Sequence, residues 1–164
     1  MNDTPSAWAN SPLDREVVLT RVVDADLRTA FDAWADPTQI VKWFGPAGFS
    51  LDTSEIDIRP GGRWRFMMVA PDGTEFPNRM EFLRVEDQKL IEARHGTDAD
   101  DDPDAFHLLV TFDAQDNGKT VVTLRQMHPS AERRAIVIGF GAVEFGGQTL
   151  DKLAAHAAGQ KTEG

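Results

Sequence analysis

Turn-forming clusters recur at short intervals through the middle of the chain, and they constrain its fold more than any other feature. Four clusters divide the part that follows Pro46, at residues 59–62, 71–73, 86–88 and 116–118. In the short segments between them apolar residues alternate with polar ones, as in strands that bury one face. Strands joined by such short connections pair in antiparallel order. The sequence therefore predicts an antiparallel meander that ends at Met127.

Six strands are predicted in the meander, and a seventh precedes it. The meander strands are expected at residues 49–58, 63–69, 79–85, 89–94, 105–112 and 120–127. The run EVVLTRVV at residues 16–23 is rich in β-branched residues and predicts the first strand. Alternation places Trp64, Phe66 and Met68 opposite Arg63 and Arg65. One face of the sheet is therefore expected to be apolar and the other partly polar.

Two short helices are predicted between the first strand and the meander. Asp24 is expected to cap the first helix, because its carboxylate can accept a hydrogen bond from an early backbone N–H group. The apolar stripe of this helix consists of Leu27, Ala30, Phe31 and Trp34. The second helix is expected to begin at Asp36-Pro37, with Gln39 as a capping-box partner, and to stop at Gly45-Pro46.

The longest helical signal covers residues 130–158. Its apolar positions recur every three or four residues, at Ile136, Phe140, Val143, Gly147, Leu150 and Ala154. We expect a helix that begins at Ser130, ends at Gly159 and packs Ile136, Phe140, Val143 and Leu150 on the apolar face of the sheet. Its glycines, Gly139, Gly141, Gly146 and Gly147, indicate close backbone packing or a bend.

These elements predict an α+β fold class. It consists of a curved antiparallel sheet of six to seven strands around a long C-terminal helix, with two short helices after the first strand. We expect residues 1–12 to form a flexible arm, residues 13–159 the domain and residues 160–164 a flexible tail. A curved sheet that holds a helix leaves a space between the two.

Composition excludes several classes of function. The chain has 17 Lys and Arg against 27 Asp and Glu, a net charge of -10, which disfavours nucleic acid or an anionic membrane as a partner. It has no Cys, which excludes disulfides, thiolate metal sites and a cysteine nucleophile. No secretory signal or apolar run long enough to span a membrane is evident, so the cytoplasm is the expected location.

Several short motifs, in this order and spacing, resemble one protein superfamily. They are Thr20-Arg21, Ala30–Trp34, Asp36-Pro37, Trp43–Pro46, Arg59–Gly62 before Trp64, Pro71–Gly73 and Thr149–Leu153. The chain is similar, over residues 15–158, to the START-like, helix-grip superfamily, also called SRPBCC. Within it the resemblance is to the branch named after activators of the heat-shock chaperone ATPase. The resemblance implies a curved sheet that grips the C-terminal helix around a cavity, in proteins that range from lipid carriers to aromatic polyketide cyclases.

A ligand site in that cavity would be mainly apolar, with a few polar groups. The apolar candidates for its lining are Phe44, Trp64, Phe66, Met68, Leu108, Val110, Val122, Leu124 and Phe140. Each could instead be ordinary core. Gln126 is the polar candidate, because it shares a strand face with Leu124 and its amide could orient a ligand. A satisfied amide at the sheet edge is the alternative.

The sequence identifies no catalytic residue and no metal site. Its four histidines lack the spacing of metal ligands. The acidic run at residues 98–104 lacks the Gly and Glu of a calcium loop and is interpreted as a solvated loop. The segment Gly139–Gly141 imitates part of a dinucleotide fingerprint, but too few residues follow it. Ionisable groups that could act as acid or base if they face inward are Glu81, Arg84, Arg94 and His128.

Three classes of function remain open at this point. The leading hypothesis is the binding of a hydrophobic or aromatic small molecule in the cavity, without a cofactor, by a monomer or homodimer. The second is an enzyme of the cyclase, dehydratase or hydrolase type that uses the same cavity; two ionisable side chains inside the pocket would favour it. The third is a co-chaperone or stress-response interaction module, which an exposed apolar patch on a solid domain would favour.

Overall fold

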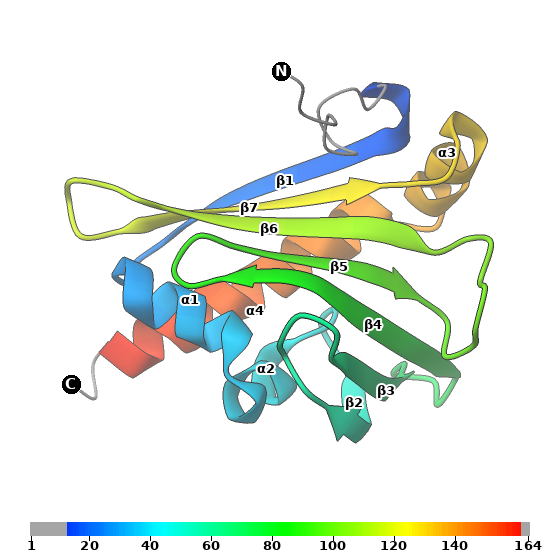
Figure 1. Ribbon diagram of the computed structural model, residues 1–164, viewed down its shortest axis with the longest axis horizontal. Coiled ribbons are helices and arrows are strands. Elements are labelled where there is room, and N and C mark those ends of the chain that lie inside the picture. Colours follow the sequence, from blue (N-terminus) through cyan, green and yellow to red (C-terminus); the bar gives the residue numbers. More distant parts are fainter. Residues whose placement is uncertain (1–12, 162–164) are drawn as a thin grey trace.

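The computed structural model describes residues 13–161, in which a curved seven-stranded sheet holds helices against one face (Figure 1). Every neighbouring pair of strands is antiparallel, in the order β1-β7-β6-β5-β4-β3-β2. The strands are β1 (Glu16–Val23), β2 (Ser50–Ile56), β3 (Arg63–Val69), β4 (Glu75–Glu86), β5 (Leu90–Gly96), β6 (Phe106–Ala114) and β7 (Thr120–Met127). The predicted α+β class and meander are confirmed. The expected arm at residues 1–12 lies outside the described residues.

Alternation along the strands separates a core face from a polar face, as predicted. Trp64 and Phe66 of β3 are buried, while Arg63 between the turn and Trp64 is exposed. β4 begins four residues before its expected start, because the turn at Pro71–Gly73 is tight and pairing with β3 extends from Val69 opposite Glu75. Gly73 closes that turn, with its backbone N–H donating to the carbonyl of Ala70 at 2.9 Å.

The two short helices are confirmed as α1 (Leu27–Ala35) and α2 (Pro37–Trp43). The predicted cap of α1 is wrong by two residues: Asp26, not Asp24, accepts the hydrogen bond from the backbone N–H of Thr29, at 2.9 Å. The reason is that Ala25 is fully buried and continues the turn after β1, so the helix starts later. Asp36 caps α2 as expected, and the side chain of Gln39 donates to its carboxylate at 3.1 Å.

The single C-terminal helix that we expected is two helices, α3 (Ala131–Gly139) and α4 (Ala142–Lys161) (Figure 1). A short 3-10 helix, η1 (Leu13–Arg15), precedes β1. The chain bends at Gly141, whose φ of 96° lies in the left-handed region that only glycine adopts without strain. Of the two readings of the glycines, the bend is therefore correct at this position.

The bend moves several predicted core residues into solvent. Phe140 caps the end of α3 and is 78% exposed, so its predicted packing on the sheet is wrong. Ile136 and Val143 are about 40% exposed as well, at 41% and 39%. Leu150 alone of the four is fully buried, because α4 and not α3 crosses the apolar face.

Close backbone packing, the other reading of the glycines, holds α4 to the edge of the sheet. A Cβ at Gly146 would lie 2.4 Å from Cδ1 of Leu19 on β1, so a larger residue there would require the Leu19 side chain to move. Arg21 of β1 donates to the carbonyl of Gly147 and pairs with Asp151, each at 3.0 Å. Residues 160 and 161, predicted to belong to a tail, are part of α4.

Candidate functional site

A cavity of about 230 Å³ lies between the sheet and the bend that joins α3 to α4. Its wall is mainly apolar, and five of the ten predicted site residues contribute to it: Phe44, Met68, Leu108, Leu124 and Gln126. The rest of the lining is Gly45, Pro46, His95, Phe106, His128, Val137, Ala142, Phe145, Gly146 and Thr149. The segment after α2 therefore borders the cavity, and the α3–α4 bend covers it.

The other predicted lining residues lie elsewhere. Trp64, Phe66, Val110 and Val122 are buried in the core and are not part of the cavity wall. Trp64 stacks on Phe66 with ring centroids 4.0 Å apart, and Phe44 covers both rings. Phe140 is on the solvent side of the bend. Along β3 the change from core to cavity falls between Phe66, whose ring contacts Phe44, and Met68, which lines the cavity.

Two histidines at the cavity wall were not predicted as binding residues. His95 of β5 is hydrogen-bonded through Nε2 to Oδ1 of Asn78, at 2.8 Å. His128, which follows β7 and is 2% exposed, is hydrogen-bonded through Nε2 to Oε1 of Gln126, at 3.1 Å. The amide of Gln126 thus contacts another residue of the cavity wall. The sequence could have indicated His95, because this residue lies two positions after Ala93 on an alternating strand and therefore on the same, inward face.

The ring of Phe106 contacts the rings of both histidines. The ring of Phe106 lies 5.0 Å from His95 and 4.9 Å from His128, measured between ring centroids. Burial lowers the pKa of His95 to about 4, although the nearby carboxylate of Asp102 opposes the shift. Burial, together with the positive charges of Arg133 and Arg134, also lowers the pKa of His128 to about 4. Both imidazoles are therefore neutral at neutral pH.

A wider cleft of about 450 Å³ adjoins the cavity on its solvent side. The two spaces share Met68, His95, Phe106 and Val137, so they lie next to each other. The cleft adds Phe76, Pro77, Asn78, Gly96, Thr97, Asp102, Asp104 and Arg133. We call the first space the inner cavity and the second the outer cleft. The inner cavity is mainly apolar, whereas the outer cleft has charged groups at its rim.

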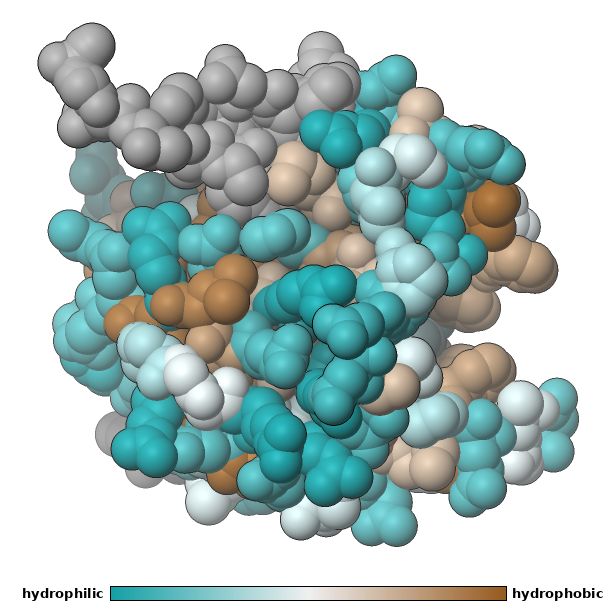
Figure 2. All heavy atoms as spheres, turned by 45° about the vertical axis from the view of Figure 1, so that its right-hand side comes forward, coloured by the Kyte–Doolittle hydropathy of each residue, from teal (hydrophilic) through white to brown (hydrophobic). Residues whose placement is uncertain are grey.

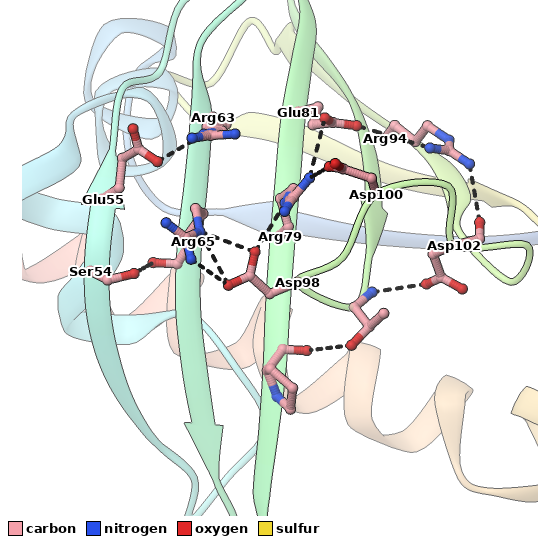
Figure 3. A network of polar contacts seen from close by, with 12 residues as sticks. Ser54, Glu55, Arg63, Arg65, Arg79, Glu81, Arg94, Asp98, Asp100 and Asp102 are labelled. Carbon is pink, nitrogen blue, oxygen red and sulfur yellow. Dashed lines mark hydrogen bonds and ion pairs between the residues drawn. The ribbon is translucent and has the colours of Figure 1, made fainter.

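The loop between β5 and β6 forms one wall of the outer cleft, and arginines of the outer sheet face anchor it (Figure 3). Arg65 donates from Nε and Nη2 to the carboxylate of Asp98 in three contacts, at 3.0 to 3.1 Å. Arg79 donates to Asp98 at 3.0 Å and to Asp100 at 2.6 Å. The acidic run predicted as a solvated loop is therefore tied to β3 and β4. Figure 2 shows that this side of the molecule is mainly hydrophilic, with a hollow at the right margin of the view.

A family model for "Activator of Hsp90 ATPase homolog 1-like protein" matches residues 24–158. The match covers α1, α2, α3, most of α4 and all the strands except β1. The chain belongs to this family. The family is part of the START-like, or SRPBCC, superfamily, so the resemblance drawn from the sequence motifs is confirmed.

Solved structures share the fold of this family member. Protein NE0264 from Nitrosomonas europaea is 23% identical, with a TM-score of 0.81 over 92% of this chain and 99% of the other. Protein Ms6760 from Mycobacterium smegmatis is 26% identical, with a TM-score of 0.77 over 89% and 93%. An AHSA1 protein from Silicibacter pomeroyi is 19% identical, with a TM-score of 0.72 over 88% and 99%. None of the curated proteins compared matches this chain.

Among the ionisable groups considered for catalysis, only His128 faces the cavity. Glu81, Arg84 and Arg94 belong to ion pairs on the outer face of the sheet: Arg84 with Glu92 at 2.9 Å, and Arg94 with Glu81 at 3.9 Å. Within residues 13–161 no cluster of three or more His, Asp or Glu could hold a metal ion. No helix in the described part of the chain is long and apolar enough to cross a membrane.

Proposed function

We propose that this protein binds a small, largely apolar molecule with a flat aromatic part in the inner cavity. The observation that carries the proposal is a mainly apolar cavity under a helix bend, with few polar groups, of which Gln126 and His128 are hydrogen-bonded to each other. Ligand sites in proteins have this composition, and together the inner cavity and the outer cleft reach the usual range of about 300–1,000 Å³. Members of the family's fold commonly bind hydrophobic ligands, which supports the same reading.

The chemistry of the wall favours an aromatic ligand over an aliphatic one. Phe106 and Phe145 offer ring faces and edges, and Met68 offers a polarisable sulfur, all of which make favourable contacts with a flat ring. The pair of Gln126 and His128 supplies hydrogen-bonding groups at one end of the cavity. Stacking and dispersion would provide affinity, and this pair would provide direction.

The test uses N-phenyl-1-naphthylamine, an uncharged fluorescent probe, titrated into the full chain. We expect saturable binding that quenches tryptophan emission. Leu108→Trp and Leu124→Trp each replace a leucine of the cavity wall by a larger aromatic side chain. Each should weaken probe binding at least about tenfold, because the indole ring occupies space that the probe needs and the packed core cannot expand to restore it. Leu83→Trp is the matched control, because Leu83 is 45% exposed and is not part of the cavity wall.

Unchanged affinity in both cavity variants, with the control also unchanged, would contradict binding in this cavity. Thermal melts of the three variants establish whether each remains folded. Two cavity variants are used because either leucine is buried and one of the larger side chains could disturb the sheet.

A second candidate, acid–base catalysis, is favoured by the two neutral histidines at the same cavity. A neutral imidazole can accept a proton at one nitrogen and donate at the other, and His95 and His128 reach the space from two sides of Phe106. Hydrolysis of 2-naphthyl acetate tests this candidate. We expect a rate above that of buffer which falls in both His95→Asn and His128→Asn. A wild-type rate equal to that of buffer would contradict a hydrolase.

A further inference from the structure

The polar groups of the outer cleft differ in how far their hydrogen bonding is already satisfied. Asn78 is engaged on both sides of its amide: Oδ1 contacts His95 at 2.8 Å, and Nδ2 donates to the carbonyl of Phe76 at 2.9 Å. Asp102 accepts backbone N–H groups with both oxygens, from Thr97 and from Asp104, each at 2.9 Å. These residues hold the β5–β6 loop in place and have little capacity left for a ligand.

Arg133 is the exception. Its Nε is buried and has no hydrogen-bond partner among residues 13–161. Its Nη1 lies 3.8 Å from the carboxylate of Asp104, which is an ion pair but too long for a hydrogen bond. A guanidinium has five N–H donors in a planar fork, so most of the donors of Arg133 are available. Leaving a buried donor without a partner is costly, and a ligand with acceptor oxygens would relieve that cost.

The position of Arg133 connects it to the inner cavity. Arg133 lies in the first turn of α3, four residues before Val137, so both side chains project from the same face of the helix. Val137 lines both the inner cavity and the outer cleft, whereas Arg133 lines only the outer cleft. A molecule that fills the inner cavity and extends past Val137 therefore reaches the guanidinium.

The charges around the cavity are divided, with arginines on the α3 side and carboxylates on the loop side. Arg133 and Arg134 both act on His128, where they add to the effect of burial in lowering its pKa. The opposing carboxylates are on the loop side: Asp102 is close to His95, and the side chain of Asp104 is 56% exposed to solvent. Because the histidines of the wall are neutral, Arg133 is the positively charged residue of the cleft lining with which the carboxylate of a ligand can pair.

We propose that the ligand is an amphipathic organic acid, whose aromatic part occupies the inner cavity and whose carboxylate binds Arg133 in the outer cleft in place of Asp104. This inference rests on the proposed function and adds the chemical class of the ligand. Planar carboxylate and guanidinium groups pair through two parallel hydrogen bonds, which the present contact of Arg133 with Asp104 does not provide.

The experiment compares three ligands that share one ring system and differ in charge. 2-Naphthoic acid, 2-naphthamide and 2-(aminomethyl)naphthalene displace the uncharged probe from the full chain at neutral pH and low salt. We expect the acid to bind about tenfold more tightly than the amide, and the amine to bind most weakly. Arg133→Gln should abolish the difference between acid and amide and leave the affinity of the uncharged probe unchanged.

Three further variants separate recognition from general electrostatics and from misfolding. Arg133→Lys keeps the charge but not the planar fork, and should retain only part of the preference for the acid. Asp104→Asn removes the competing carboxylate and should tighten binding of the acid. Arg59→Gln makes the same change of charge at a residue that is not part of the cavity or the cleft, and should leave the preference intact.

The outcomes distinguish this inference from the proposal on which it rests. If the wild-type protein binds the uncharged probe but prefers the amide or the amine to the acid, only the assignment of the ligand as an acid is overturned, and the proposed function stands. A preference for the acid that survives in Arg133→Gln overturns the role of Arg133. Absence of saturable probe binding to the wild-type protein overturns the proposed function itself, and this inference with it.

Discussion

His128 illustrates how the fold changes the chemistry of a single residue. Its ring is 2% exposed and lies near Arg133 and Arg134, so burial and positive charge lower its pKa from 6.5 to about 4. In the sequence it is one of four histidines without a motif. Its assignment to the cavity depends on the end of β7 turning inward beside Phe106, which residue spacing does not reveal.

The shift predicts how stability depends on pH. Between about pH 6.5 and about pH 4 the unfolded chain binds a proton at His128 that the folded protein does not, so stability is complete above this window and decreases as the pH falls through it. We expect the unfolding free energy of the wild type to fall, relative to that of His128→Gln, by up to about 1.4 kcal/mol per pH unit. Urea denaturation of both proteins at several pH values measures this difference in unfolding free energy. A difference that does not change with pH would contradict the shift.

Burial also separates two residues that the helical pattern treats alike. Phe140 is 78% exposed and Leu150 is fully buried, so truncation should affect them differently. We expect Phe140→Ala to change the unfolding free energy by less than about 0.5 kcal/mol. Leu150→Ala should cost about 2–5 kcal/mol, because it removes contacts and leaves a cavity. Denaturant unfolding compares the two, and a similar loss in both would show that the ring of Phe140 is packed in solution.

At the scale of elements, the bend between α3 and α4 is the feature that shapes the site. α4 lies against β1 at Gly146, whereas α3 contributes Arg133 and Val137 to the outer cleft. Phe140 ends α3 with its N–H donating to the carbonyls of Ile136 and Val137, and the backbone then turns at Gly141. The bend thus allows one helix to complete the core and the other to border the outer cleft.

Two glycines beside this bend provide a matched test. Gly141 has φ of 96°, and a Cβ there would lie 3.2 Å from the ring of Phe145, so Gly141→Ala should destabilise the protein by about 1–2 kcal/mol. Gly139 ends α3, and a Cβ there would meet no atom within 4 Å. Gly139→Ala should therefore be neutral or stabilise by up to about 1 kcal/mol. Thermal unfolding measures both variants; a stabilising Gly141→Ala would mean that the helix is continuous.

At the scale of the whole molecule, the sheet depends on α4 to bury its apolar face. Leu150, Leu153 and Ala157 of α4 are fully buried in the same core as Trp34 of α1 and Trp64 of β3. Within residues 13–161 no helix covers the other face of the sheet, where arginines and acidic residues form ion pairs (Figure 3). Removing α4 would expose most of one side of the core to water.

A chain that ends at Gly141 should therefore not fold. We expect it to lack a cooperative thermal transition and to bind the uncharged probe without saturation, as collapsed chains with exposed apolar surface do. A chain that ends at residue 161 retains all of α4 and should melt cooperatively. Circular dichroism follows both transitions. An unchanged cooperative melt of the shorter chain would contradict the role of α4 in the core.

Local patterns were sufficient to predict the strands, the first two helices and the fold class from the sequence. Three strands, Glu16–Val23, Arg63–Val69 and Thr120–Met127, have the bounds that alternation and turn residues predict. The signals are local, because a strand face repeats every two residues and a turn requires particular residues within a few positions. Family motifs at these same turns then indicated a sheet around a C-terminal helix.

Tertiary structure alone decided which side chains form the site. Trp64 and Met68 lie on one face of one strand, yet the first is buried against Phe44 in the core and the second is part of the cavity wall. Each glycine in a helix interior costs about 1 kcal/mol relative to alanine. Whether the helix continues or bends at these glycines depends on how α4 packs against β1, which helical periodicity does not indicate. His95 and Arg133 come together at the cleft from elements far apart in the chain. The sequence determined the sheet, whereas the contacts between its covering elements determined the cavity.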